Sequence, residues 1–386
     1  MSIAPQRPSN AAVLRELSLT AVLDALREHP RGSRAELATQ TGLSKPTVGA
    51  ALGALGEGGL VRERGRSTGR RGPGASLYEF VPDAATALAV DAGSRRVRAV
   101  VTDLEGATLR DLEVRLRRPT ASKLLDAIGK IAAELRGAET ELAVVGSPGI
   151  VDPTSGRIRS SPQIDGWEGI EAEKTLTDVI GVRTTVENDV NLAAAGELAR
   201  GSGRGRSSFA YLNVGSGLGA GLVFDGRLFR GRHGAAGEVG FLAIGAATDD
   251  GDGVRRGAME TRLSGGALVE FAQRRDRDAP DDLKELFDRA RSGDRLGRAV
   301  VEEAVAAIAA CVASINAVVD LELVLLGGGI GGQTELLLEP VREAVARLVP
   351  YPPELMAGEL GDRATLAGAT AIGVEEARRA LIRRCL

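Results

Sequence analysis

The chain has 386 residues, a formal net charge of −3 and 43% hydrophobic residues, the composition of a globular protein with two or three domains. Its only cysteines, Cys311 and Cys385, exclude a disulfide framework and a cysteine-based zinc site. The first ten residues lack the apolar core of a secretory signal, and the longest apolar run, 304–319, is short for a membrane span. We therefore expect a cytoplasmic protein without a membrane partner.

The first eighty residues are basic, whereas the remainder of the chain is acidic. They contain eleven Lys and Arg residues against seven Asp and Glu residues, which suggests an anionic partner for this part. Apolar residues at helical spacing predict a first helix near 11–29. An S-x-x-E capping box, Ser33 and Glu36, begins a short second helix, a glycine turn follows at 41–43, and Ser44 caps a third helix.

Two short helices joined by a glycine turn form a helix-turn-helix. In this motif the N-terminal end of the second helix meets base edges and phosphates in the major groove of duplex DNA. Ser44, Lys45 and Thr47 lie at that end, so we expect them to contact DNA.

A second DNA-contacting element is predicted directly after these helices. Strands near 60–63 and 77–80 bracket a loop rich in glycine and arginine, which is typical of a wing. Arg66, Arg70 and Arg71 in this loop are expected to contact phosphates or to enter a narrow minor groove. The alternative interpretation is a three-helix packing module with a solvated basic loop.

Two hairpins with the same plan lie farther along the chain, AVDAGSRRVRAVVTDLEG at 89–106 and AYLNVGSGLGAGLVFDG at 210–226. Each runs from a strand through a glycine turn into a second strand, with Asp91 and Gly93 in the first turn. This repetition predicts a duplicated α/β fold with a ligand cleft between two lobes.

Glycine-rich turns allow backbone N–H groups to converge on an anion. The turn of the second hairpin and the later strand-to-glycine run LELVLLGGGIGG at 321–332 are therefore candidate nucleotide contacts, although the later run could also be a plain strand-to-helix turn. The candidate residues in these two segments are Ser216, Gly217, Gly219 and Gly328.

Polar residues follow a short strand in VENDVNLAAAGE at 186–197, where a helix is expected to begin. Such a position points side chains into a cleft, and the Asn188 amide beside the Asp189 carboxylate suits the recognition of hydroxyl groups. A carboxylate placed there could also deprotonate a hydroxyl that attacks phosphorus. Taken alone, the pair would more often be a helix cap than a ligand site, and Glu238 in its glycine-rich setting would usually be a surface residue.

Six segments in this order resemble motifs of the ROK family of repressors and sugar kinases, in particular its winged-helix regulator branch. They are STGRRGPGASLYEF, GSPGIVDPTSG, ENDVNLAAAGE, NVGSGLGAGLV, GRHGAAGEVG and VLLGGGI. The resemblance covers nearly the whole chain. It implies an N-terminal winged helix-turn-helix, mainly α-helical, followed by the α/β two-lobed actin-like ATPase fold, which is ribonuclease H-like.

The same resemblance implies roles for individual positions. Asn188 and Asp189 match the sugar-binding pair, in which the aspartate is the general base of the kinases. Gly149 matches the glycine of the sugar loop. Glu238 and Glu260 match the glutamates of two further motifs, the second of which also reaches sugar hydroxyls.

The chain departs from the family pattern at the zinc site. The family holds zinc with one histidine and three cysteines, but Phe241 stands at the histidine position, Ala258 at a cysteine position, and the segment between them contains no cysteine. We therefore expect neither zinc nor another cofactor. Phe241 also removes a hydrogen-bonding partner of the sugar, which puts the usual sugar of the family in doubt.

A second departure lies in the phosphate motif Asp-x-Gly-x-Thr of the kinases, which reads DAGSR at 91–95 and is followed by Arg96. The bulk of the arginines and the missing threonine hydroxyl predict that this nucleotide site is vestigial and that the chain has no catalytic residues of its own. Arg95 and Arg96 are either solvated or hold an anionic ligand.

The expected organisation has three parts. Residues 1–82 form the DNA-binding domain, residues 83–188 form a small lobe that a C-terminal helix at 370–386 completes, and residues 189–369 form a large lobe with the ligand cleft and a dimer interface.

The expected function is that of a transcriptional regulator, a repressor of genes for carbohydrate metabolism or uptake. Its partners would be an operator in duplex DNA, a sugar or sugar-derivative effector bound at Asn188, Asp189, Glu238 and Glu260, and a second copy of the chain, with a tetramer also open. The alternatives are an ATP-dependent sugar kinase with an attached DNA-binding domain, and a DNA-binding protein whose cleft takes no ligand.

Overall fold

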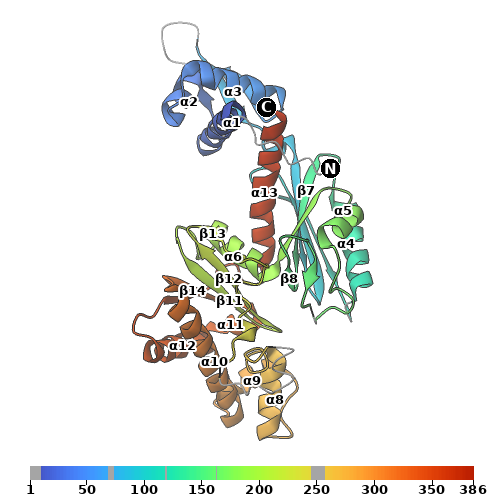
Figure 1. The fold of residues 1–386 in the computed structure, drawn as a ribbon, viewed down its shortest axis with the longest axis vertical. Helices are drawn as coiled ribbons and strands as arrows, with labels where there is room; N and C mark the ends of the chain where they lie inside the picture. Colours follow the sequence, from blue (N-terminus) through green and yellow to red (C-terminus); the bar gives the residue numbers. More distant parts are fainter. Residues whose placement is uncertain (1–9, 68–73, 118–119, 162, 245–256) are drawn as a thin grey trace.

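The structure is a computed structural model, and it describes residues 10–67, 74–117, 120–161, 163–244 and 257–386. An N-terminal helical part, a small lobe and a large lobe follow one another along the chain, and the last helix returns from the large lobe to the N-terminal part (Figure 1).

The N-terminal part has the predicted winged-helix arrangement. Its helices are α1 (Asn10–Glu28), α2 (Arg34–Thr41) and α3 (Lys45–Glu57), and its sheet has the order β1-β3-β2. The strands are β1 (Gly32–Ser33), β2 (Val61–Arg66) and β3 (Ser76–Phe80). The capping box that fixes the start of α2 is present, because the backbone N–H of Ser33 donates to Glu36 Oε2 at 2.8 Å and the Ser33 hydroxyl accepts from the backbone N–H of Glu36.

The small lobe is built on a five-stranded sheet with the order β10-β7-β4-β5-β6. Helices α4 (Ala121–Leu135) and α5 (Ala172–Ile180) cover one face of this sheet, and the C-terminal helix α13 (Ala364–Arg384) covers the other (Figure 1). Alternate side chains of the central strand, β4 (Thr86–Ala92), point to opposite faces of the sheet. Leu88 packs with α4 and α5, and Ala89 packs with α13. The strands are β4 (Thr86–Ala92), β5 (Arg96–Thr102), β6 (Thr108–Arg115), β7 (Thr140–Ser147) and β10 (Thr184–Asn188).

The large lobe repeats this plan in its own five-stranded sheet, of order β13-β12-β11-β14-β15. In both sheets the first hairpin is antiparallel and the two later strands join it in parallel, which confirms the predicted duplication. The strands are β11 (Phe209–Val214), β12 (Leu218–Phe224), β13 (Arg227–Leu228), β14 (Leu323–Gly327) and β15 (Glu354–Ala357).

Helix α6 (Asp189–Arg200) lies on the face of the second sheet that is turned toward α13. The opposite face carries α8 (Gly265–Arg275), α9 (Leu283–Arg291), α10 (Arg295–Val319) and α12 (Thr334–Leu348). Helix α10 is long and apolar enough to cross a membrane by length and composition alone, but one face of it, which includes Val300, Ile308 and Val312, is buried in the core of the lobe. Smaller elements are β8 (Ile150–Val151), β9 (Ile158–Arg159), the single turn α11 (Gly328–Gly331), and the 3-10 turns η1 (Pro82–Ala84), η2 (Val239–Phe241) and η3 (Gly361–Arg363).

The C-terminal helix begins at Ala364 rather than at the expected position 370. Its first half contains Gly368 and Gly373, which disfavour a helix in the sequence. The structure supplies the reason for Gly368: helices α6 and α13 cross so closely there that a Cβ atom on Gly368 would lie 1.8 Å from the carbonyl oxygen of Leu192. The glycine is thus required by the contact between the two lobes, not by a break in the helix.

Replacing Gly368 by alanine is expected to lower the free energy of unfolding by about 2–4 kcal/mol, because the two helix backbones would have to separate. Gly266 in α8 provides a matched control, since a Cβ atom there meets no heavy atom within 4 Å. Gly266→Ala should be neutral or stabilise the chain by up to about 1 kcal/mol. Urea denaturation of both variants tests this, and equal effects would contradict the tight crossing.

Helix α13 also connects the lobes to the N-terminal part (Figure 1). Near its end, Arg383 Nε lies 3.3 Å from Glu16 Oε1, and Arg15 Nη2 donates to the carbonyl oxygen of Cys385 at 3.1 Å. One apolar cluster joins Leu26 of α1 to Ile382 of α13 and continues into the sheet of the small lobe. A single helix therefore runs from the cleft between the lobes to the helices of the N-terminal part.

Candidate ligand site and DNA-binding surface

A cavity of about 300 Å³ opens between the two lobes, a volume at the lower end of those of small-molecule pockets. It is lined by all five residues that the sequence assigned to a ligand, Gly149, Asn188, Asp189, Glu238 and Glu260. Five residues of the two hairpins, Asp91, Gly93, Ser216, Gly217 and Gly219, line the same cavity. Gly328 does not, and instead lines an adjoining cavity of about 510 Å³ together with Asp91 and Asp189.

Asn188 and Asp189 occupy the junction between β10 and α6. Asn188 Oδ1 accepts the backbone N–H groups of Val190 and Asn191, both at 2.9 Å, and its Nδ2 donates to the carbonyl oxygen of Gly149 at 3.1 Å. The side chain is therefore a helix cap that also holds the loop carrying Gly149 at the cavity wall. The Asp189 carboxylate lies beside it and lines both cavities.

The two glutamates come from the segment that crosses the opposite wall of the cavity. Glu238 directly precedes η2, and the carbonyl oxygen of Gly240 in that turn accepts the backbone N–H of Glu260 at 3.1 Å. Glu260 Oε2 in turn accepts the backbone N–H of Leu218 at 3.3 Å. These contacts bring carboxylates that are 22 residues apart in the chain to one side of the cavity.

Several acidic side chains lie close together in this cavity, and two of them have raised pKa values. Burial, together with the neighbouring carboxylates of Asp91 and Glu238, raises the pKa of Asp189 to about 7. Burial and the neighbouring Glu260 raise the pKa of Glu238 to about 7. A cavity with these acids suits an uncharged ligand with several hydroxyl donors, because hydrogen bonds from hydroxyls stabilise the carboxylate form.

The raised pKa of Asp189 makes the stability of the unliganded protein depend on pH. This contribution is favourable below the unfolded value near 4 and is lost as the pH rises through about 7, because the folded chain binds the proton more tightly. Between about pH 5 and pH 8, the free energy of unfolding of Asp189→Asn should therefore fall by about 1–3 kcal/mol less than that of the wild type. Urea denaturation at several pH values measures this. Asp126→Asn on the exposed face of α4 is the control. If the free energy of unfolding of Asp189→Asn fell with pH as much as that of the wild type, the raised pKa of Asp189 would be contradicted.

The residues assigned to DNA contact lie at the N-terminal end of α3. Ser44 and Lys45 are exposed and Thr47 is half-buried. The Ser44 hydroxyl accepts the backbone N–H of Thr47 at 3.2 Å and lies 2.7 Å from the Thr47 hydroxyl, so both hydroxyls already serve the helix cap. Lys45 makes no hydrogen bond or ion pair with the described part of the chain, which leaves its ammonium group available to DNA.

The wing is only partly visible. Arg66 is exposed at the end of β2, whereas Arg70 and Arg71 lie outside the described residues. Two of the other basic residues on this hairpin, Arg62 and Arg64, lie 2.6 and 3.1 Å from Glu79 Oε1, which leaves them less free to meet phosphates.

Arg34 at the start of α2 is a basic residue that the sequence interpretation missed. Its guanidinium lies 5.8 Å from the ring centroid of Tyr78 and donates to the Tyr78 hydroxyl at 3.1 Å. The contact ties α2 to the wing strand β3, and the pairing of β1 with β3, which the sequence interpretation did not include, brings the two elements together.

The phosphate turn after β4 holds two arginines with different surroundings. Arg95 is exposed, and its side chain has no hydrogen bond or ion pair with the described residues. Arg96 is not simply solvated, because its Nη2 lies 2.8 Å from Asp362 Oδ2. Asp362 was absent from the sequence interpretation, since it is far away in the chain.

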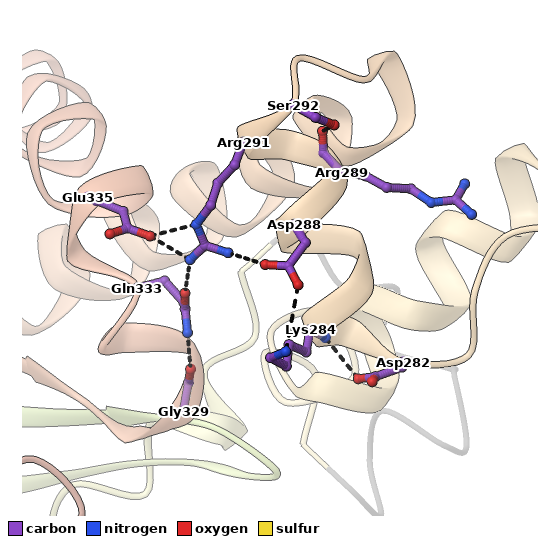
Figure 2. Close-up of polar contacts among 9 residues, drawn as sticks. All are labelled: Asp282, Lys284, Asp288, Arg289, Arg291, Ser292, Gly329, Gln333 and Glu335. Atoms are coloured by element: carbon purple, nitrogen blue, oxygen red, sulfur yellow. Dashed lines mark hydrogen bonds and ion pairs between the residues drawn. The ribbon is translucent and has the colours of Figure 1, made fainter.

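The glycine run after β14 is held by a polar network among α9, α11 and α12 (Figure 2). Gln333 Nε2 donates to the carbonyl oxygen of Gly329 at 3.3 Å, and Arg291 contacts the side chains of Gln333, Glu335 and Asp288. Lys284, a cation at this end of the cleft, lies 3.7 Å from Asp288. The network connects the carbonyl oxygen of Gly329 to α9 and α12 through Gln333 and Arg291.

The described positions that match zinc ligands of the family offer no zinc donor in this chain. Phe241 presents a ring that is 47% exposed and lines the ligand cavity, and Ala258 offers no donor atom. Among the described residues, no group of three or more His, Cys, Asp or Glu side chains could hold a metal ion. Residues 245–256 lie outside the described residues, and their sequence contains neither histidine nor cysteine.

Comparisons with known proteins match both parts of the chain. A model of the ROK family matches residues 87–376, and a model of the IclR helix-turn-helix domain matches residues 19–65. A glucokinase of Thermotoga maritima is 31% identical over 254 residues, covering 61% of this chain and 80% of the relative. A xylose repressor of Caldicellulosiruptor bescii is 24% identical over 392 residues, covering 95% of this chain and 98% of the relative.

Among solved structures, too, the chain is similar to both a transcriptional regulator and a kinase. A ROK family transcriptional regulator, described as a homolog of the E. coli MLC protein, superposes with a TM-score of 0.79 at 20% identity, covering 96% of this chain and 98% of its own. A ROK family glucokinase from Streptomyces griseus, in complex with glucose and AMPPNP, superposes with a TM-score of 0.65 at 28% identity, covering 75% and 99%. The regulator structure thus superposes on nearly the whole chain, and the kinase structure superposes on about three quarters of it.

Proposed function

The chain belongs to the ROK family, and because a helix-turn-helix domain precedes its two lobes, we propose that it is a sugar-responsive, DNA-binding transcriptional regulator that represses genes of carbohydrate metabolism or uptake. The observation that carries this proposal is that one helix, α13, contacts both Asp189, which lines the ligand cavity, and α1, which packs against the helix α3 assigned to DNA contact. The full-length match to a xylose repressor supports the same conclusion.

The effector in this proposal is a sugar or sugar derivative bound between the lobes. Asp189, Glu238 and Glu260 accept hydrogen bonds from its hydroxyl groups, and Asn188 positions the Gly149 loop against it. Phe241 packs against an apolar part of the ligand, where family members place a histidine. Binding is then dominated by carboxylate acceptors and needs neither zinc nor another cofactor.

The signal reaches DNA through α13. The Thr365 hydroxyl at the start of this helix donates to the carbonyl oxygen of Asp189 at 3.1 Å, so a movement of the ligand-binding residues displaces the helix. The other end of α13 carries the DNA-binding helices with it. In a homodimer, such a displacement changes the distance between the two recognition helices, and half-site spacing on DNA tolerates little change. The ligand shifts the equilibrium between the two arrangements of the DNA-binding helices, displaced and not displaced, only by the difference in its affinity for them.

A sugar kinase is the second candidate function, and one observation favours it. Asp189 keeps the position of the general base, with a pKa of about 7 that suits proton transfer near neutral pH. Against it stand Ser94, Arg95 and Arg96, which replace the threonine and the open turn of the kinase phosphate motif. We therefore assign regulation, in the cytoplasm, as the function of the chain and expect no catalytic turnover.

A sugar screen separates the two functions. Thermal shifts with glucose, xylose and their phosphates identify the effector, and a coupled assay of ADP release tests phosphorylation with the same compounds. The regulator predicts that a stabilising sugar changes the dissociation constant for operator DNA by at least about fivefold, a typical coupling energy, without ADP release. Sugar-dependent ADP release with unchanged DNA affinity would identify a kinase.

A further inference from the structure

The carboxylate of the phosphate turn is already occupied by a side chain of the protein. Asp91 and Arg98 face each other directly across the β4–β5 hairpin, and Arg98 Nη2 donates to Asp91 Oδ2 at 2.9 Å. The Arg98 side chain is only 10% exposed, so this ion pair lies inside the cleft rather than on its rim. A guanidinium stays protonated even when buried, so Asp91 faces a permanent positive charge.

A second carboxylate reaches Arg98 from the opposite side. Asp362 Oδ2 lies 3.2 Å from Arg98 Nη1 and 2.8 Å from Arg96 Nη2, and Arg98 Nη2 also contacts the carbonyl oxygen of Asp362. Asp362 belongs to η3, between the last strand of the large lobe and the start of α13. Two guanidinium groups and two carboxylates thus form a charge-balanced cluster that ties β5 to the segment joining the lobes.

This cluster is incompatible with a metal-bound nucleotide. In phosphoryl transfer a divalent cation, held by protein carboxylates, bridges the phosphates of the nucleotide. Here the carboxylate of the turn is paired, and a divalent cation would have to displace the buried guanidinium or lie beside it as a like charge. The residues therefore do not fit a magnesium–nucleotide complex, although a relative in the family was solved with glucose and AMPPNP.

We propose that Arg98 is a specificity-determining residue of the cleft: its guanidinium acts as a built-in cation for Asp91 and Asp362 and makes the cleft reject metal-bound nucleoside triphosphates. The neighbouring arginines do not share this role. Arg95 is exposed and contacts neither carboxylate, and Arg96 reaches only Asp362, itself 65% exposed. The inference does not depend on the proposed function, because it concerns the binding of magnesium and nucleotide and not the binding of sugar or DNA.

Removing the built-in cation should create a site for an external one. Arg98→Met keeps most of the side-chain volume and leaves the Asp91 carboxylate buried without a partner, so Mg²⁺ should bind there. We expect about 10 mM MgCl₂ to raise the melting temperature of Arg98→Met by about 2 °C or more, and that of the wild-type chain by less than about 1 °C. The matched control is Asp91→Asn with Arg98→Met, which lacks both charges and should behave as the wild type.

Calorimetric titration with AMPPNP extends the test to the nucleotide. The wild-type chain should show no magnesium-dependent binding, and Arg98→Met should gain it by at least about tenfold. Magnesium-dependent AMPPNP binding by the wild type would overturn the proposal, and this result does not require any variant to fold. A folded Arg98→Met without a magnesium response, or an equal response in the double variant, would also overturn it. DNA and sugar enter neither measurement, so failure here is separate from failure of the regulatory function.

Discussion

Replacing Lys45 and Thr47 together by alanine is expected to weaken sequence-specific DNA binding of the full chain by about 10²-fold or more. Each contact to a base edge contributes about 1–3 kcal/mol of discrimination, and both residues lie at the N-terminal end of α3, which we propose to enter the major groove. Thr47 also contributes a hydroxyl to the Ser44 cap, so its loss loosens the first turn of the helix. Titration of genomic fragments with the purified variant measures the effect.

The control for this experiment is Lys130→Ala, which removes a lysine from an exposed ion pair with Asp126 on α4. That variant should bind DNA as the wild type does. The melting temperature of Lys45→Ala with Thr47→Ala should stay within a few degrees of the wild type, since Lys45 is exposed, Thr47 is half-buried and neither belongs to the apolar core. Unchanged sequence-specific binding by the double variant would show that α3 is not the recognition helix.

Asp189→Asn is expected to weaken sugar binding by about 10²-fold or more. A hydrogen bond to a charged group contributes about 1.5–3 kcal/mol, and a carboxylate in this cavity can accept from two hydroxyls, whereas the amide can accept with only one oxygen. The substitution keeps the shape of the side chain and relieves the repulsion among the buried acids. Calorimetric titration with the sugar that stabilises the wild type measures the loss.

The same variant should bind DNA with the wild-type affinity when no sugar is present, because the hydrogen bond from α13 is accepted by the backbone carbonyl oxygen of residue 189, which the substitution keeps. Asp126→Asn, which changes an acid on the exposed face of α4, is the control and should bind the sugar normally. Wild-type sugar affinity in Asp189→Asn would place the effector outside this cavity.

Local sequence signals accounted for much of the fold. The capping box at Ser33 and Glu36, the cap at Ser44 and the glycine turn predicted the helix-turn-helix because each acts within a few residues. The two glycine hairpins predicted the duplication, and the structure has the same strand order in both sheets. The start of α13 was misjudged because Gly368 serves a contact between helices, and such a contact leaves no local signal.

The candidate site was predictable to a lesser extent. Asn188 and Asp189 follow a strand and open a helix, a pattern that marks a cleft, and family resemblance supplied Glu238 and Glu260. Arg98 had a signal that was not used: it is the cross-strand partner of Asp91, which the register of the predicted hairpin would have given. No sequence signal pointed to Asp362, because only the tertiary fold brings η3 next to β5, a strand more than 260 residues earlier in the chain.

We propose that a ligand between the lobes controls DNA binding through α13. The most direct measurement is the dissociation constant for operator DNA, with and without the stabilising sugar, for the wild-type chain and Asp189→Asn. We expect the sugar to weaken DNA binding of the wild type by at least about fivefold and to leave the DNA binding of Asp189→Asn unchanged. Equal DNA affinity of the wild type with and without saturating sugar would contradict it.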